Sequence, residues 1–217
     1  MNELSVLQKG IYAEKYPYPH LVIDDCLPTE LYNQLKRTRP HFTGEGSNKR
    51  YDISAYKALE MALDPVWEEF IKYHCSEEFY KEVDALFDLG LEGEVGMRNV
   101  GRKPIRLDCQ ISINTPVKEE SQVCIAHIDN PETKWAGLLY MPDDDDDAGG
   151  DLEIYNCPKP EYFGKRRVAN PGPPIKIVPY KDNIFICFKN SPTSVHAPQA
   201  RKPTNITRKF VNFVIDS

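Results

Sequence analysis

The chain has 217 residues, with 27 Lys and Arg, 33 Asp and Glu and a formal net charge of -6. A chain of this length can bury a full hydrophobic core as one domain, as all-β barrels and sandwiches of similar size do. The basic residues are scattered, so the positive surface of a nucleic-acid-binding protein is not expected, and no apolar stretch is long enough to span a bilayer.

The N-terminal segment MNELSVLQKGIYAEKYPYPH contains no apolar run of the kind found in a secretory signal. The six cysteines form no CxxC pair, and several lie inside apolar runs such as IFICF. This distribution is typical of buried free thiols in a reducing compartment rather than of a zinc knuckle or a disulfide framework. We therefore expect a cytoplasmic protein that does not associate with membranes.

Helical periodicity is confined to the first half of the sequence. Leu31 and Leu35 lie four positions apart after the short apolar run HLVIDD, and Pro40 ends the pattern, which predicts a helix over about 29–38. Farther along, apolar residues recur at spacings of three and four, and Pro65 and Ser76 are suitable helix starts. This region is expected to form two or three helices that pack against a sheet.

From Ile105 onward the sequence changes to seven short β-type runs, each bounded by Pro, Gly, Asn or Asp. The runs are RLDCQISIN, QVCIAHID, WAGLLYM, DLEIYN, PIKIVPY, NIFICFK and RKFVNFVID. Strands that follow a helical segment predict a mainly β (α+β) fold, a β-sandwich or jelly roll supported by N-terminal helices. We expect a single domain over 1–217, with a helical entry and support segment over 1–104 and a jelly-roll core over 105–217.

The run AHIDN is a candidate metal site. His127 and Asp129 are two positions apart, and on a strand their side chains would point to the same face. Two ligands do not hold a metal, and His196, in SVHAP, can supply the third because distant strands become neighbours in a jelly roll. Two histidines and one carboxylate on one face suit non-haem Fe(II) and O₂ chemistry. The alternative is that His196 is an ordinary loop residue.

The final strand-like run TRKFVNFVID places Arg208 and Asn212 on one face and is apolar on both faces beyond its start. This pattern predicts a strand covered on both sides. A buried guanidinium needs an anionic partner, and no Asp or Glu is an obvious one, so the carboxylate of a ligand is a candidate. The alternative is an Arg208 side chain that is exposed at a sheet edge.

The ordered set of HIDNP, GLLYM, an acidic loop, GGDLEIY, DNIFICF, SVHAP and TRKFVNFVI resembles the 2-oxoglutarate and Fe(II)-dependent dioxygenases of the prolyl-4-hydroxylase-like branch. The segment YPYPHLVIDDCLPTELYNQL is also similar to the N-terminal segment of many members. The resemblance extends from about residue 17 to 216. It implies a double-stranded β-helix (jelly roll, cupin-like) with the catalytic core over 105–217.

The resemblance implies roles for individual residues. Three of them, His127, Asp129 and His196, would be catalytic iron ligands. Arg208 would bind the distal carboxylate of 2-oxoglutarate, Tyr140 would share that carboxylate through its hydroxyl, and Asn212 would be a small polar helper. Arg201, five residues after His196, is a competing anchor, but it lies in the loop QARKPTN rather than in a strand.

The activity that the resemblance implies is hydroxylation of an unactivated C–H bond. The cofactor would be Fe(II), with 2-oxoglutarate and O₂ as cosubstrates and ascorbate in a supporting role. The substrate would be a protein prolyl residue or a small amino-acid-like metabolite. One alternative is a metal-binding cupin-like protein with a non-oxygenase activity, and another is a non-catalytic interaction module. Asp129 disfavours a halogenase, because halide binding in related enzymes needs a small residue there.

Two further segments, QISINTP and the acidic run, are relevant to the site. Where prolyl hydroxylases commonly have a tyrosine, this sequence has QISINTP, so Gln110 or Asn114 is expected to contact the cosubstrate. The acidic run DDDDD lacks the ligand spacing of a calcium loop and is interpreted as a solvated hairpin tip, followed by a Gly149-Gly150 turn.

The segment over 157–174 is long and rich in Pro, Gly and basic residues, as functional lids and binding loops often are. Our hypothesis is that Lys165, Arg166 and Arg167 select an acidic or carboxylate-bearing substrate. The alternative is an ordinary solvent-facing loop.

Overall fold

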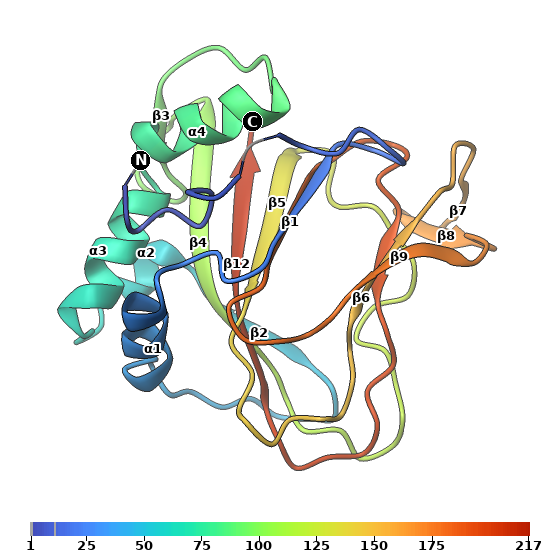
Figure 1. Ribbon diagram of the computed structural model, residues 1–217. Helices are drawn as coiled ribbons and strands as arrows, with labels where there is room; N and C mark the ends of the chain where they lie inside the picture. Colours follow the sequence, from blue (N-terminus) through green and yellow to red (C-terminus); the bar gives the residue numbers. More distant parts are fainter. Residues whose placement is uncertain (1, 11) are drawn as a thin grey trace.

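Most strands of the computed structural model, which describes residues 2–10 and 12–217, belong to one large, mainly antiparallel sheet (Figure 1). Its main path runs β1 (His20–Ile23), β10 (Phe185–Lys189), β5 (Thr133–Tyr140), β12 (Arg208–Asp216), β4 (Ile105–Asn114) and β2 (Arg50–Ile53). The seventh strand, β3 (Val95–Met97), pairs with β4 in parallel. Three of these strands, β1, β2 and β3, come from the first 104 residues, where the sequence predicts only helices.

A smaller antiparallel sheet faces the large one. It contains β11 (His196–Pro198), β6 (Leu152–Tyr155) and β9 (Pro174–Val178), in that order. Beside it, β7 (Glu161–Phe163) and β8 (Arg167–Ala169) form a hairpin within the segment that the sequence indicates as a long irregular loop. The fold is therefore mainly β with antiparallel sheets, as the sequence predicts.

The helices lie on the side of the large sheet that is opposite the small sheet (Figure 1). They are α1 (Thr29–Arg37), α2 (Ala55–Ala58), α3 (Pro65–His74) and α4 (Glu77–Phe87). Pro65 occupies the first turn of α3, and the Ser76 side chain accepts a hydrogen bond from the Phe79 amide at the start of α4. Both observations agree with the helix starts expected from the sequence.

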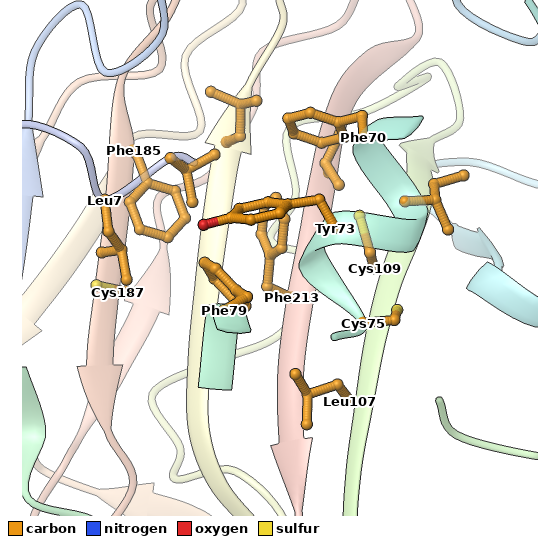
Figure 2. Close-up of a cluster of buried hydrophobic side chains, with 14 of the residues drawn as sticks. Leu7, Phe70, Tyr73, Cys75, Phe79, Leu107, Cys109, Phe185, Cys187 and Phe213 are labelled. Atoms are coloured by element: carbon orange, nitrogen blue, oxygen red, sulfur yellow. The ribbon is translucent and has the colours of Figure 1, made fainter. Parts of the chain in front are cut away.

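Strand β12 separates two hydrophobic cores. Phe213 and its neighbours on one face pack against the helices, where Phe70 and Tyr73 of α3 and Phe79 of α4 surround it (Figure 2). Phe210, on the opposite face, packs in a second cluster between the two sheets. The strand is therefore covered on both sides, as its apolar sequence predicts, and the face that carries Arg208 looks toward the small sheet.

The run QVCIAHID does not form a strand, which contradicts the sequence prediction. His127 makes only isolated bridges to His196 and Arg167. All six cysteines are free, and four of them are buried. Among residues 2–10 and 12–217, no helix combines the length and the apolar character needed to cross a bilayer.

Candidate functional site

The side chains of His127, Asp129 and His196 converge at one point beside the small sheet. The backbones of His127 and His196 exchange two hydrogen bonds of 3.0 Å, which place their rings side by side with centroids 4.5 Å apart. Asp129 Oδ1 lies 4.0 Å from Nε2 of His127 and 3.9 Å from Nε2 of His196. One donor atom from each residue lies within 4.8 Å of the others, close enough for a single metal ion.

Backbone carbonyl groups orient both imidazole rings. Nδ1 of His127 lies 2.8 Å from the Ile125 carbonyl oxygen, and Nδ1 of His196 lies 2.9 Å from that of Ser194. A carbonyl only accepts hydrogen bonds, so Nδ1 of each ring is the donor in this contact and Nε2 is the ring nitrogen that faces Asp129. Two imidazoles and one carboxylate match the donor set of non-haem Fe(II) sites, so these residues fit that ion.

The three donors line a cavity of ≈ 380 Å³ between the two sheets. Arg208, Asn114 and Asn212 from the large sheet line the same cavity, and the Phe188 ring stacks 4.5 Å from that of His196. The sequence-predicted donors and Arg208, which are far apart in the chain, therefore share one cavity. Asp129 is the one carboxylate among the described residues that line it.

Arg208 is 4 % exposed, and its guanidinium stacks on the Tyr180 ring with Cζ 4.0 Å from the ring centroid. Its Nη1 donates a hydrogen bond to the Gly150 carbonyl oxygen. In the part of the chain that the structure describes, no carboxylate forms an ion pair with this guanidinium. A buried cation without an anionic partner is costly, so Arg208 is a candidate site for an anionic ligand group.

Tyr140, on β5, lies next to Arg208 and is fully buried. Its hydroxyl has no hydrogen-bond partner among the described residues. Burial raises the pKa of Tyr140 to about 12, although the nearby Arg208 charge opposes the shift. The hydroxyl therefore remains protonated at neutral pH, and an unpaired buried donor beside an unpaired buried cation matches a carboxylate ligand.

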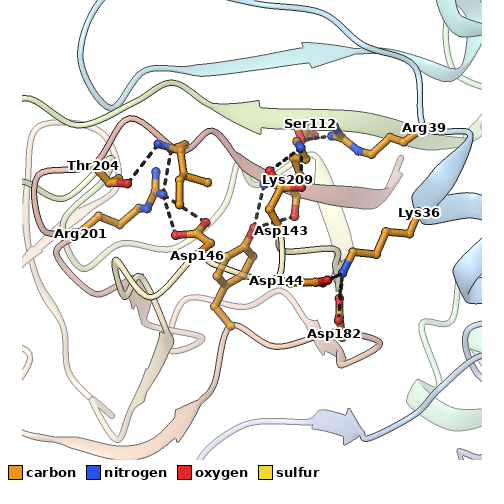
Figure 3. Close-up of polar contacts among 12 residues, drawn as sticks. Lys36, Arg39, Ser112, Asp143, Asp144, Asp146, Asp182, Arg201, Thr204 and Lys209 are labelled. Atoms are coloured by element: carbon orange, nitrogen blue, oxygen red, sulfur yellow. Dashed lines mark hydrogen bonds and ion pairs between the residues drawn. The ribbon is translucent and has the colours of Figure 1, made fainter.

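Arg201, the competing anchor, already has an anionic partner. Its Nη2 lies 3.2 Å from Asp146 Oδ1, both side chains are almost completely buried, and Nη2 also donates to the Ile206 carbonyl (Figure 3). Arg201 does not line the cavity that holds the three donors. This arrangement favours Arg208 over Arg201 as the residue available to a ligand.

The acidic run is not simply a solvated tip, which corrects the sequence interpretation. Three of its five aspartates form ion pairs: Asp143 with Lys209, Asp144 with Lys36 and Asp146 with Arg201 (Figure 3). The run therefore connects the end of β5 to the helices and to the last strand. Although the run consists of identical residues, three of its aspartates each have a specific basic partner.

Asn212 and Gln110 are paired directly across β12 and β4. Nδ2 of Asn212 donates to Oε1 of Gln110 at 2.7 Å, and Nε2 of Gln110 donates to Asp108 at 2.8 Å. Asn114, unlike Gln110, lines the cavity, and its buried Oδ1 has no partner among the described residues. Of the two residues left open by the sequence, Asn114 is the one in a position to contact a ligand.

Two residues of the site were not predicted from the sequence. Tyr180 lies under the Arg208 guanidinium, and Arg50, on β2, lines the cavity. Tyr180 ends a strand-like run and carries no motif, so only its place in the fold reveals its role. Arg50 lies in a short strand with exposed residues, which has no β-type sequence pattern.

No protein-family model matches the sequence, and no curated protein shows significant similarity to it. Several solved structures share the fold. A Pseudomonas putida prolyl-4-hydroxylase aligns over 100% of this chain and 98% of its own, with a TM-score of 0.52 and 13% identity. A 2OG-Fe(II) oxygenase family protein from Burkholderia pseudomallei aligns over 91% of this chain and 84% of its own, with a TM-score of 0.54 and 11% identity.

A third structure is that of the epimerase SnoN in complex with Fe³⁺, alpha-ketoglutarate and nogalamycin RO. It aligns over 91% of this chain and 78% of its own, with a TM-score of 0.51 and 10% identity. The chain therefore shares its fold with prolyl-4-hydroxylases and 2OG-Fe(II) oxygenases. This likeness agrees with the antiparallel, jelly-roll-like architecture predicted from the sequence.

Proposed function

We propose that this protein is an Fe(II)- and 2-oxoglutarate-dependent oxygenase of the prolyl-4-hydroxylase-like branch. One observation carries the proposal: two imidazoles and a carboxylate converge in the same cavity as a buried arginine that has no carboxylate partner among the described residues. A metal-binding jelly roll with another activity needs the first feature but not the second. The prolyl hydroxylases and 2OG-Fe(II) oxygenases that share the fold support this choice.

In this proposal His127, Asp129 and His196 hold the iron as the catalytic centre. Bound Fe(II), with 2-oxoglutarate and O₂, supplies the oxidation of an unactivated C–H bond, while 2-oxoglutarate is converted to succinate and CO₂. One oxygen atom enters succinate and the other enters the new hydroxyl group. Ascorbate would support the enzyme by keeping the iron reduced.

The chain's own contribution is binding, orientation and exclusion of water. Arg208 presents a planar fork to the distal carboxylate of 2-oxoglutarate, and the protonated Tyr140 hydroxyl donates a further hydrogen bond to it. Asn212, held by Gln110, adds a polar contact on the same wall. Burial of Arg208 and Tyr140 strengthens these interactions because little water competes for the charge.

The two facing sheets would form the double-stranded β-helix of the branch, within a single domain over 1–217. Residues 1–104 would be the entry and support segment and 105–217 the catalytic core. The enzyme would act in the cytoplasm on a protein prolyl residue or on a small amino-acid-like metabolite.

The direct test is O₂-dependent formation of succinate from 2-oxoglutarate by the purified protein, measured with and without Fe(II). We expect turnover that requires Fe(II) and is abolished in His127→Ala. His41→Ala is the matched control, because His41 lies outside the cavity and should leave turnover unchanged. Iron binding without any Fe(II)-dependent consumption of 2-oxoglutarate would instead support the non-oxygenase alternative.

A further inference from the structure

Two arginines besides Arg208 line the cavity. Arg50 projects from β2 in the large sheet, and Arg166 lies in the turn between β7 and β8, so the two residues come from separate elements. Under the proposed function, Arg208 is committed to 2-oxoglutarate and Asp129 to the metal. The charges of Fe(II) and 2-oxoglutarate cancel, so these ligands leave the positive charges of Arg50 and Arg166 in place.

Arg50 is only partly engaged by the protein. Its Nε lies 2.9 Å from Asp52 Oδ1, and its guanidinium carbon lies 5.2 Å above the centroid of the Phe210 ring inside the cavity. Its terminal nitrogens have no hydrogen-bond acceptor among the described residues. A guanidinium held at Nε and by an aromatic face is oriented, and its remaining donors are available to a ligand.

Arg166 belongs to a hairpin that is fixed to the metal site. Its carbonyl oxygen accepts a hydrogen bond of 3.1 Å from the Ile128 amide, and the adjacent Arg167 bridges His127. No described carboxylate pairs with the Arg166 side chain. The β7–β8 hairpin is therefore hydrogen-bonded to the segment that carries His127 and Asp129. It places the unpaired Arg166 guanidinium in the same cavity as these two metal donors.

The basic character continues outside the main cavity. A neighbouring cavity of ≈ 330 Å³ is lined by Lys165, Arg166 and Arg167, together with His127. A cavity wall with several cations and few acids attracts anions and disfavours cationic compounds. This electrostatic setting extends from the surface of the hairpin to the metal donors.

We propose that the substrate to be oxidised carries a carboxylate or phosphate group that Arg50 and Arg166 bind. This inference rests on the proposed function. The arginine fork matches either oxyanion in geometry, and both groups can accept two parallel hydrogen bonds. The anion would orient the target carbon toward the metal donors. A neutral prolyl segment would leave Arg166 without a partner and Arg50 with only its contact to Asp52.

Matched pairs of probes test this proposal through substrate-stimulated succinate formation. The free-carboxylate pair is N-acetyl-L-proline and N-acetyl-L-prolinamide, and the phosphate pair is N-acetyl-O-phospho-L-serinamide and N-acetyl-L-serinamide. The peptide pair is an N-acetylated, C-amidated, proline-containing tetrapeptide with flanking Glu or Gln. We expect kcat/KM to be at least about tenfold higher for the anionic member of the preferred pair. The pair that responds identifies the source of the anion.

Arg166→Gln and Arg50→Gln should each reduce this anionic preference by roughly tenfold, and Arg166→Lys should restore part of it because a positive charge is kept. Lys159→Gln is the control, since Lys159 is exposed in the same 157–174 segment but does not line the cavity. Equal or better use of the neutral members, or no response to any anionic member, would overturn the proposal. Absence of Fe(II)-dependent succinate formation without any probe would instead count against the proposed function.

Discussion

The Gly150 carbonyl oxygen accepts a hydrogen bond from Nη1 of Arg208, and a Cβ atom at position 150 would overlap that nitrogen. Gly150 also has a φ of +92°, a conformation that other residues rarely adopt. Glycine at this position is therefore required both by the backbone and by the close approach of the guanidinium. The Gly149-Gly150 turn therefore also holds the Arg208 guanidinium through the Gly150 carbonyl.

Gly150→Ala should displace the Arg208 guanidinium and raise KM for 2-oxoglutarate by about tenfold or more, because the ligand's partner is moved. Steady-state kinetics with varied 2-oxoglutarate measures this effect. Gly101→Ala is the control, since Gly101 also has a positive φ but a Cβ atom added there would meet no other atom within 4 Å. An unchanged KM in Gly150→Ala would show that the position of Arg208 does not control cosubstrate binding.

The two candidate anchors should behave oppositely. Arg208→Gln should raise KM for 2-oxoglutarate by roughly thirtyfold or more, about 2 kcal/mol, because a buried charge-assisted contact is lost. Arg201→Gln should instead lower the free energy of unfolding by about 3–5 kcal/mol, because it leaves Asp146 buried and unpaired.

Chemical denaturation together with kinetics separates the two effects. Adding Asp146→Asn to Arg201→Gln should recover part of the lost stability, since the unpaired charge is then removed. A large rise in KM for Arg201→Gln with little change for Arg208→Gln would reverse the assignment.

Tyr140→Phe should weaken 2-oxoglutarate binding without destabilising the ligand-free protein. The Tyr140 hydroxyl is buried without a partner among the described residues, so its removal relieves an unsatisfied donor, and only the ligand loses a hydrogen bond. We expect about a tenfold rise in KM and an equal or higher melting temperature. Tyr180→Phe is the comparison, because its hydroxyl accepts from the Lys209 amide at 2.8 Å and its loss should lower stability. A clear loss of stability in Tyr140→Phe would argue for a structural role.

His74 should make the fold sensitive to acid. It is buried among aromatic side chains, and this burial lowers its pKa from 6.5 to about 3. The folded pKa lies below the unfolded value, so the unfolded chain binds the additional proton between these pH values. Stability is therefore lost as the pH falls below 6.5 toward 3, by at most about 1.4 kcal/mol per pH unit.

Denaturant unfolding between about pH 4 and pH 6 measures this dependence. His74→Gln, which remains neutral, should flatten the slope of unfolding free energy against pH. The same slope in both proteins would mean that His74 does not account for the acid sensitivity.

The sequence predicted the parts of the site that depend on local pattern. The apolar run around Arg208 and Asn212 identified β12, and alternation along it correctly separated the cavity face from the helix face. The spacing of His127 and Asp129 suggested that they share a face. The structure brings them together without a strand, because the backbone hydrogen bonds between His127 and His196 hold the segment.

Two other contacts between distant segments could not be predicted. The ion pair between Arg201 and Asp146 joins a loop to an acidic run in which the five aspartates are equivalent at the level of sequence. Likewise, Arg50 reaches the cavity only because β2 pairs with β4, and the short exposed β2 has no strand-like periodicity. Such contacts are set by tertiary packing rather than by local preference.

We infer that one cavity binds Fe(II) through His127, Asp129 and His196 and 2-oxoglutarate through Arg208. Anaerobic addition of Fe(II) and 2-oxoglutarate, followed by visible absorption spectroscopy, tests both parts together. We predict a weak visible charge-transfer band that requires both additions, disappears in His127→Ala and needs a higher 2-oxoglutarate concentration in Arg208→Gln. Absence of this band in the folded wild-type protein would contradict the claim.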